Sequence, residues 1–111
     1  MPRTITTILN IFINGVKEIL GDHLEKIILY GSYARGDFNN ESDIDIMVLT
    51  NLTDNEIIEY RKIISDFTFD IELENNISIS PLIKNIDKFN KRIDIVPFYM
   101  NVMNEGVLLN G

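Results

Sequence analysis

The chain has 111 residues, with 17 acidic side chains against 10 basic ones and a net charge of -7. That length predicts a single small domain over residues 1–111, and the acidity argues against direct binding of nucleic acid, which needs clustered Lys and Arg. The absence of Cys excludes disulfides, cysteine-ligated zinc and thiol catalysis. No apolar run approaches the roughly 18 residues of a membrane span, and no signal peptide is visible, so we expect a cytoplasmic protein without membrane contact.

The first half of the chain predicts a helix followed by two strands. In residues 4–20, apolar side chains recur every three or four positions, which indicates a helix with one buried face. Residues 26–30 are a short apolar run that ends at a glycine, and residues 43–50 become continuously apolar, so both are predicted strands. The segment 31–42 between them is rich in Gly, Ser, Asn and Asp and predicts a loop with one turn of helix.

The second half predicts a long helix, a third strand and two short helices. Thr53 or Asp54 is the expected N-cap of a helix that runs to about residue 75. Residues 77–84 alternate over their first half and predict a strand, in which Pro81 favours an edge position or a bulge. Short helices are expected around 86–92 and 97–104, the second closed by Gly106. This order predicts an α/β or α+β fold with a small mixed β-sheet.

A turn at Gly31-Ser32 has the features of a phosphate cradle. Gly31 allows a ligand to approach the backbone closely, and Ser32 is the expected N-cap of a helical turn that Gly36 closes. The N–H groups at the start of that turn and the Ser32 hydroxyl form a small anion site, for which phosphate is the natural guest. Taken alone, such a turn is more often a plain connection without a ligand.

Asp43 and Asp45 stand at the start of the second predicted strand. Residues two apart on a strand share a face, with Cα atoms roughly 6.5 Å apart, so the two carboxylates repel each other. A divalent cation resolves this repulsion, and hard oxygen ligands suit Mg²⁺, which also bridges substrate phosphates. An isolated pair of this kind is more often a solvated strand end. Here the pair and the cradle lie at strand ends that can converge on one triphosphate.

These two features together resemble a known family. Gly31-Ser32, ten further residues and then Asp43-x-Asp45 match the signature of DNA polymerase beta-like nucleotidyltransferases. The fuller string GSYARGDFNNESDIDIMVL is similar to that of the minimal nucleotidyltransferases, small bacterial proteins usually paired with a HEPN-domain toxin. The resemblance is specific over residues 27–50 and looser over 51–111. It implies a mixed sheet flanked by helices, an ATP and Mg²⁺ site, transfer of AMP to a protein hydroxyl, and an antitoxin role.

The resemblance also implies roles for individual residues. By position, Gly31 and Ser32 would hold the triphosphate of ATP, and Asp43 and Asp45 would be the catalytic residues that hold Mg²⁺. Arg35 lies one turn beyond the cradle, where it would bind the nucleotide by contacting a phosphate.

The alternative for Arg35 is structural. As a surface residue it would form a salt bridge to Asp37 or Glu41, and the sequence leaves both interpretations open.

One position departs from the family pattern. The family usually has a third acid on the later strand, and Ser78 stands there in this chain. A hydroxyl is a poor general base and brings no charge for a second metal ion. Two functions therefore stay open: a Mg²⁺-dependent transferase acting on a HEPN-domain toxin, and a degenerate antitoxin that neutralises its toxin by occlusion. Transfer to a small molecule such as an aminoglycoside is disfavoured, because such enzymes usually carry an extra helical domain. The sequence leaves homodimerisation open.

Overall fold

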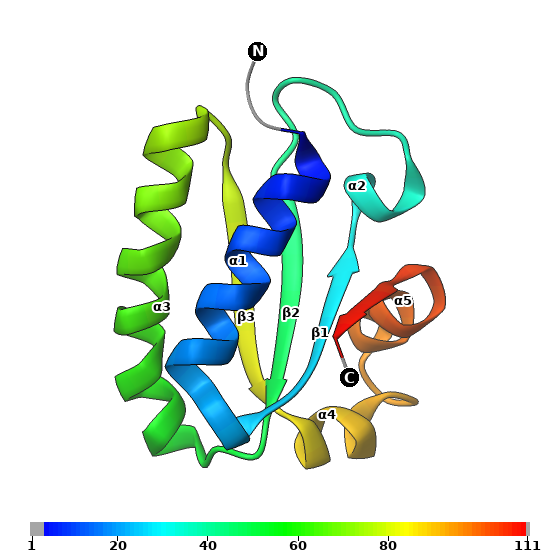
Figure 1. Cartoon of the computed structure of the whole chain (residues 1–111). Coiled ribbons are helices and arrows are strands. Elements are labelled where there is room, and N and C mark those ends of the chain that lie inside the picture. Colours follow the sequence, from blue (N-terminus) through cyan, green and yellow to red (C-terminus); the bar gives the residue numbers. More distant parts are fainter. Residues whose placement is uncertain (1–3, 111) are drawn as a thin grey trace.

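The computed structural model describes residues 4–110, which form a four-stranded sheet with helices on both faces (Figure 1). The elements in chain order are α1 (Ile5–Leu20), the 3-10 turn η1 (Gly21–His23), β1 (Leu24–Tyr30), α2 (Ser32–Arg35), β2 (Ile44–Thr50), α3 (Asp54–Asn75), β3 (Ile79–Asn85), α4 (Ile86–Arg92), α5 (Pro97–Glu105) and β4 (Val107–Asn110). Every helix and strand predicted from the sequence is present, so the predicted fold class is confirmed.

The sheet is mixed, with the strand order β3-β2-β1-β4. β1 runs antiparallel to both β2 and β4, whereas β2 and β3 are parallel. A parallel pair needs a long crossover connection, and α3 supplies it between β2 and β3. β3 is an outer strand, which confirms the edge position that Pro81 favoured.

The two faces of the sheet have separate cores. On one face, α1 and α3 cover Ile44, Ile46 and Val48 of β2, all of them fully buried. On the other face, the short helices α4 and α5 cover Met47 and Leu49. Side chains alternate between the faces of a strand, so the residue before Met47 on this second face is Asp45.

Side-chain caps fix where the two long helices begin. The Thr4 hydroxyl accepts the N–H of Thr7 at the start of α1. At the start of α3, Thr53 and Glu56 form a capping box, so Thr53 is the N-cap and Asp54 is the first helical residue. Such a cap stabilises a helix by about 1 kcal/mol. Asn76 ends α3 in the left-handed conformation, with φ 50°.

Three boundaries and one strand differ from the prediction. β1 begins two residues early, after η1, whereas β2 and β3 begin at Ile44 and Ile79 rather than at 43 and 77. β4 was not predicted: Val107 and Leu108 are largely exposed, and this four-residue strand forms because β1 offers an unpaired edge. No helix within residues 4–110 is both long enough and apolar enough to span a bilayer.

Candidate active site

The turn that the sequence predicts as a phosphate cradle lies where β1 ends and α2 begins. Gly31 has φ 75°, a conformation that strongly favours glycine, and its carbonyl accepts the N–H groups of Ala34 at 3.1 Å and Arg35 at 3.0 Å. Gly36, with φ 85°, closes the turn by donating its N–H to the Ser32 carbonyl at 2.9 Å. The prediction that Ser32 is the N-cap was wrong: Gly31 holds that position, and Ser32 is the first helical residue. The Ser32 side chain makes no capping hydrogen bond.

Gly31 lies directly against Asp45. The register of the β1–β2 ladder pairs Tyr30 with Asp45, which brings the Asp45 carboxylate beside the next residue along β1. A Cβ atom on Gly31 would lie well inside van der Waals contact of Asp45 Oδ2. The structure therefore brings Gly31 and Asp45 together, across a gap that only glycine leaves open.

The two acids have different surroundings. Asp43 is exposed just before β2, whereas Asp45 is half-buried as the second residue of the strand. Burial raises the pKa of the Asp45 carboxyl, and the negative charge of Asp43 raises it further, although Arg35 opposes the shift. The two carboxylates are thus close enough to repel each other, as the sequence predicted.

Hydroxyl groups occupy the neighbouring strand beside the acid pair. The parallel register pairs Asp45 with Ser80, and Ile44 donates its N–H to the Ser78 carbonyl at 2.8 Å, one step before the first paired residues. Glu72 contacts the start of β3 instead, where its Oε2 accepts the N–H of Ile79 at 2.9 Å. Across residues 4–110, no group of three or more His, Asp or Glu side chains is placed to hold a metal ion.

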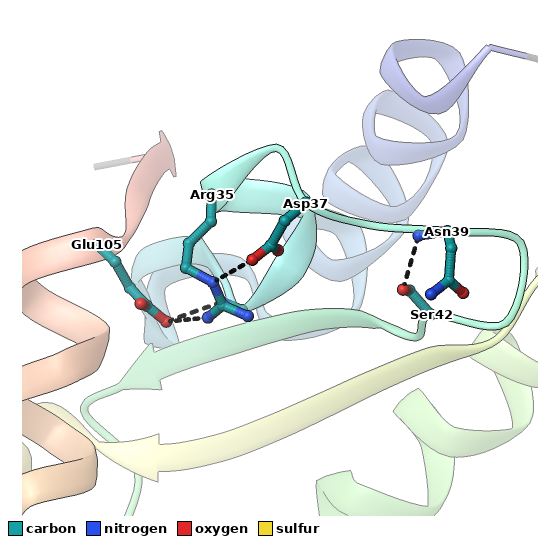
Figure 2. Close-up of polar contacts among 6 residues, drawn as sticks. Arg35, Asp37, Asn39, Ser42 and Glu105 are labelled. Carbon is teal, nitrogen blue, oxygen red and sulfur yellow. Dashed lines mark hydrogen bonds and ion pairs between the residues drawn. The ribbon is translucent and has the colours of Figure 1, made fainter.

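Arg35 connects the cradle to the last turn of α5 (Figure 2). Its Nε donates to Asp37 Oδ2 at 3.2 Å, so the salt bridge to Asp37 is confirmed. Its Nη1 donates to Glu105 Oε1 at 3.1 Å, and the same oxygen accepts the N–H of Gly31 at 3.3 Å. The structural interpretation of Arg35 therefore holds in this state, and Glu41 is not its partner among the described contacts.

Glu105 is a residue that sequence reasoning missed. It is separated from Gly31 by 74 positions and belongs to the last turn of α5. No local pattern around Glu105 indicates the contact, because it depends on how α5 packs beside β1. The carboxylate fixes both the backbone of the cradle and the direction of Arg35.

The loop before the acid pair is braced by its own side chains (Figure 2). Asn39 donates its N–H to Ser42 Oγ at 3.0 Å. Glu41 donates its N–H to Asn39 Oδ1 at 2.8 Å. At the other end of the loop, the rings of Tyr33 and Phe38 stack with centroids 4.3 Å apart and planes 9° apart. These contacts hold the loop against α2 and set where β2 begins.

Comparison with known proteins identifies relatives of the whole fold. The family model described as a nucleotidyltransferase domain matches residues 9–106. Two proteins of Methanocaldococcus jannaschii, named "Putative protein adenylyltransferase MJ0604" and "Putative protein adenylyltransferase MJ0141", are similar to the chain. The first is 35% identical over 98 residues, covering 88% of this chain and 90% of that protein. The second is 39% identical over 79 residues, covering 71% of this chain and 78% of that protein.

Two solved structures are also similar at a lower level. One is a crystal structure of a toxin-antitoxin with AMP-PNP, at TM-score 0.48 and 24% identity over 88% of this chain and 72% of that one. The other is a crystal structure of a mutant of the toxin-antitoxin MntA-HpeT, at TM-score 0.48 and 22% identity, and the match covers 89% of this chain and 72% of that chain. Both scores lie below 0.5, so we draw nothing further from them. The family match and the archaeal relatives, which both span most of the chain, show that it belongs to the nucleotidyltransferase domain family of transferase enzymes.

Proposed function

We propose that this chain transfers AMP from ATP, with Mg²⁺, to a hydroxyl group of a partner protein. The observation that carries the proposal is the convergence at Gly31, where the cradle and Asp45 are separated only by the space of a missing Cβ. A phosphate in the cradle would lie next to the two carboxylates. The names of the archaeal relatives support AMP as the transferred group and a protein as the acceptor.

The residues present fit a magnesium ion. Asp43 and Asp45 offer the hard oxygen donors that Mg²⁺ prefers. Burial, and secondarily the charge of Asp43, raises the pKa of Asp45, and a bound cation would oppose both effects. When bound, Mg²⁺ supplies positive charge against the α-phosphate and the leaving pyrophosphate. Asp43 and Asp45 would hold it, and Ser80 and Ser78 would add only neutral hydroxyls beside them.

The chain's own groups then bind and orient the reactants. The Ser32 hydroxyl and the N–H groups of the turn would hold the β- and γ-phosphates, while Gly31 leaves the backbone open to them. The acceptor oxygen forms a bond to the α-phosphorus, the bond from that phosphorus to the bridging oxygen breaks, and pyrophosphate leaves with the electron pair. The acceptor's proton passes to solvent. Positioning two reactants in this way can contribute several kcal/mol of barrier lowering, about 7 or more in favourable cases.

We further propose that the acceptor is a HEPN-domain toxin and that the chain acts as its antitoxin. The resemblance of the string from Gly31 to Leu49 to the minimal nucleotidyltransferases supports this pairing. Covalent attachment of AMP adds a bulky anionic group, which would block a toxin's active surface.

A second candidate function is neutralisation by occlusion alone. The hydroxyl of Ser78, at the position where the family usually has an acid, favours this candidate. With two carboxylates instead of three, partner binding can persist where transfer is lost. The two candidates differ in one observable, the covalent label on the partner.

The test is incubation of the protein with ATP labelled at the α-phosphate, Mg²⁺ and the product of the adjacent gene. We expect label on the partner, reduced at least about 100-fold in Asp43→Asn and in Asp45→Asn, a loss typical of removing charge stabilisation from a transition state. Asp87→Asn is the matched control, because Asp87 is an exposed acid on α4, which follows the end of β3 opposite to the site. Absence of label, with neutralisation retained in all variants, would establish occlusion instead.

A further inference from the structure

The order of strands determines from which side an acceptor reaches the α-phosphate. The cradle lies at the end of β1, the acid pair at the start of β2, and Ser78 and Ser80 at the start of β3. These three features therefore lie next to one another at the same end of the strands. In an in-line displacement, the attacking and leaving oxygens stand on opposite sides of phosphorus. If the pyrophosphate lies in the cradle at β1, the attacking hydroxyl therefore approaches from the β3 side.

A groove of about 410 Å³ is present on that side. Its walls are the loop 40–42 that precedes the acid pair, the last turns of α3, and the segment 76–78 that leads into β3. Ser42 immediately precedes Asp43, and Ser78 lies beside the start of β2. The groove thus lies beside the backbone of Asp43, and neither the turn at Gly31 nor the Asp45 carboxylate lines it.

Two large apolar side chains stand exposed on the α3 wall. Phe69 is 56% exposed and Leu73 is 67% exposed. Their spacing of four residues places them next to each other on the helix surface. Because an occupant that covers apolar surface gains roughly 25 cal/mol for each Å² removed from water, this wall favours an apolar segment over a sugar or another polar small molecule.

The charged residues that line the groove also favour one class of acceptor over another. Glu41 and Glu72 line it, and no Lys or Arg does so among the described residues. A phosphate backbone would be repelled here, which disfavours RNA or DNA as the acceptor. A protein segment with basic residues beside its hydroxyl would be attracted.

The first half of the free edge of β3 is closed to strand pairing. The N–H of Ile79 is already bound by Glu72 Oε2, and Pro81 has no N–H to offer. An occupant of the groove therefore docks through side chains and not by adding a strand to the sheet.

We propose that this groove, named here the Phe69–Leu73 groove, docks the acceptor segment of the partner protein: an apolar, basic segment whose hydroxyl reaches the α-phosphate. The proposal rests on the proposed transfer of AMP to a protein. It assigns Phe69 and Leu73 to acceptor recognition and gives them no part in binding ATP.

The test measures docking and transfer separately, with the product of the adjacent gene as the probe. In the double variant Phe69→Ser, Leu73→Ser, we expect the dissociation constant for this probe and its KM as acceptor to rise about tenfold or more, the effect of losing central contacts of an interface. The KM for ATP should stay unchanged. Ile58→Ser is the matched control, because Ile58 is 61% exposed on the same helix outside this groove.

A substitution that reverses one charge in the groove tests the docking site independently. Glu41 is exposed, and Glu41→Lys should weaken probe binding several-fold at low salt and less at high salt. Unchanged probe binding in both the double variant and Glu41→Lys would overturn the docking site, whether or not AMP is transferred. Weakened probe binding without any label on wild type would retain the groove as a docking site and refute the transferase proposal.

Discussion

The two faces of β2 show how one strand serves both stability and chemistry. On the face under α1 and α3, Ile44, Ile46 and Val48 are completely buried from the first residue of the strand to its middle. On the opposite face, the short helices cover Met47 but leave Asp45 at the strand start only half-buried. The covered face holds the fold together, and the site stands where the second covering layer stops.

The largest expected effect comes from breaking the covered face. Ile46→Ala removes buried methyl and methylene groups between the sheet and its helices, so we expect a loss of about 2–5 kcal/mol in the free energy of unfolding. Urea denaturation measures it. A loss below about 1 kcal/mol would mean that this face contributes far less than its burial indicates.

The next effect tests the contact between the cradle and the acid pair. Gly31→Ala imposes strain at φ 75° and forces a Cβ against Asp45, whereas Gly36→Ala imposes similar strain at φ 85° with nothing within 4 Å. We expect both variants to lose about 1–3 kcal/mol of stability, with the greater loss at Gly31. Calorimetric titration should show that only Gly31→Ala weakens ATP binding about tenfold or more. Equal ATP binding by the two variants would contradict the close approach of Asp45.

Asp45→Asn should stabilise the protein in the absence of metal. Burial and Asp43 raise the pKa of Asp45 above its ordinary value of 3.8, so its charged form at neutral pH costs stability. The contribution of this carboxyl to stability is greatest when it is protonated and falls as pH rises through its folded-state pKa. Thermal melts at pH 7 without Mg²⁺ should therefore place the variant above wild type, with the difference vanishing in acid. Mg²⁺ should raise the melting temperature of wild type only.

A smaller effect is expected at Tyr30, on the same face. Burial, and secondarily the charge of Asp45, raises the pKa of Tyr30 from 10.0 to about 12. The folded state therefore keeps this proton longer than the unfolded state, so the contribution is intact below pH 10 and is lost between pH 10 and about 12. Tyr30→Phe should lose less stability than wild type across this window in denaturation at fixed pH values. If the stabilities of the variant and of wild type changed equally with pH, the Tyr30 hydroxyl would be less shielded from solvent than its burial indicates.

The covered face was predictable from sequence, and so was the outline of the site. The periodic apolar residues of α1 and the run at β2 specify which surfaces are buried, and Thr53 marks a helix start through its own cap. Gly31 and the acid pair are visible as a motif because their spacing is local. Their roles, like those of Ser32 and Arg35 toward a nucleotide, stay predictions.

Features that depend on packing between distant segments were not predictable. Glu105 reaches Gly31 across 74 positions, and β4 is stabilised by the edge of β1 more than by its own exposed side chains. The Phe69–Leu73 groove likewise requires the loop 40–42 to lie beside the end of α3. Helical periodicity places these two side chains off the buried stripe of α3, but it does not show which segment they face.

The most direct test of the central claim is calorimetric titration of ATP with and without Mg²⁺. Wild type and the control Asp87→Asn should bind ATP with Mg²⁺ and lose at least about tenfold in affinity without it, roughly 1.4 kcal/mol. Asp43→Asn and Asp45→Asn should show the weaker affinity under both conditions. Affinity that is the same with and without Mg²⁺, and unaffected by either Asn substitution, would contradict an ATP and Mg²⁺ site built from the cradle and the acid pair.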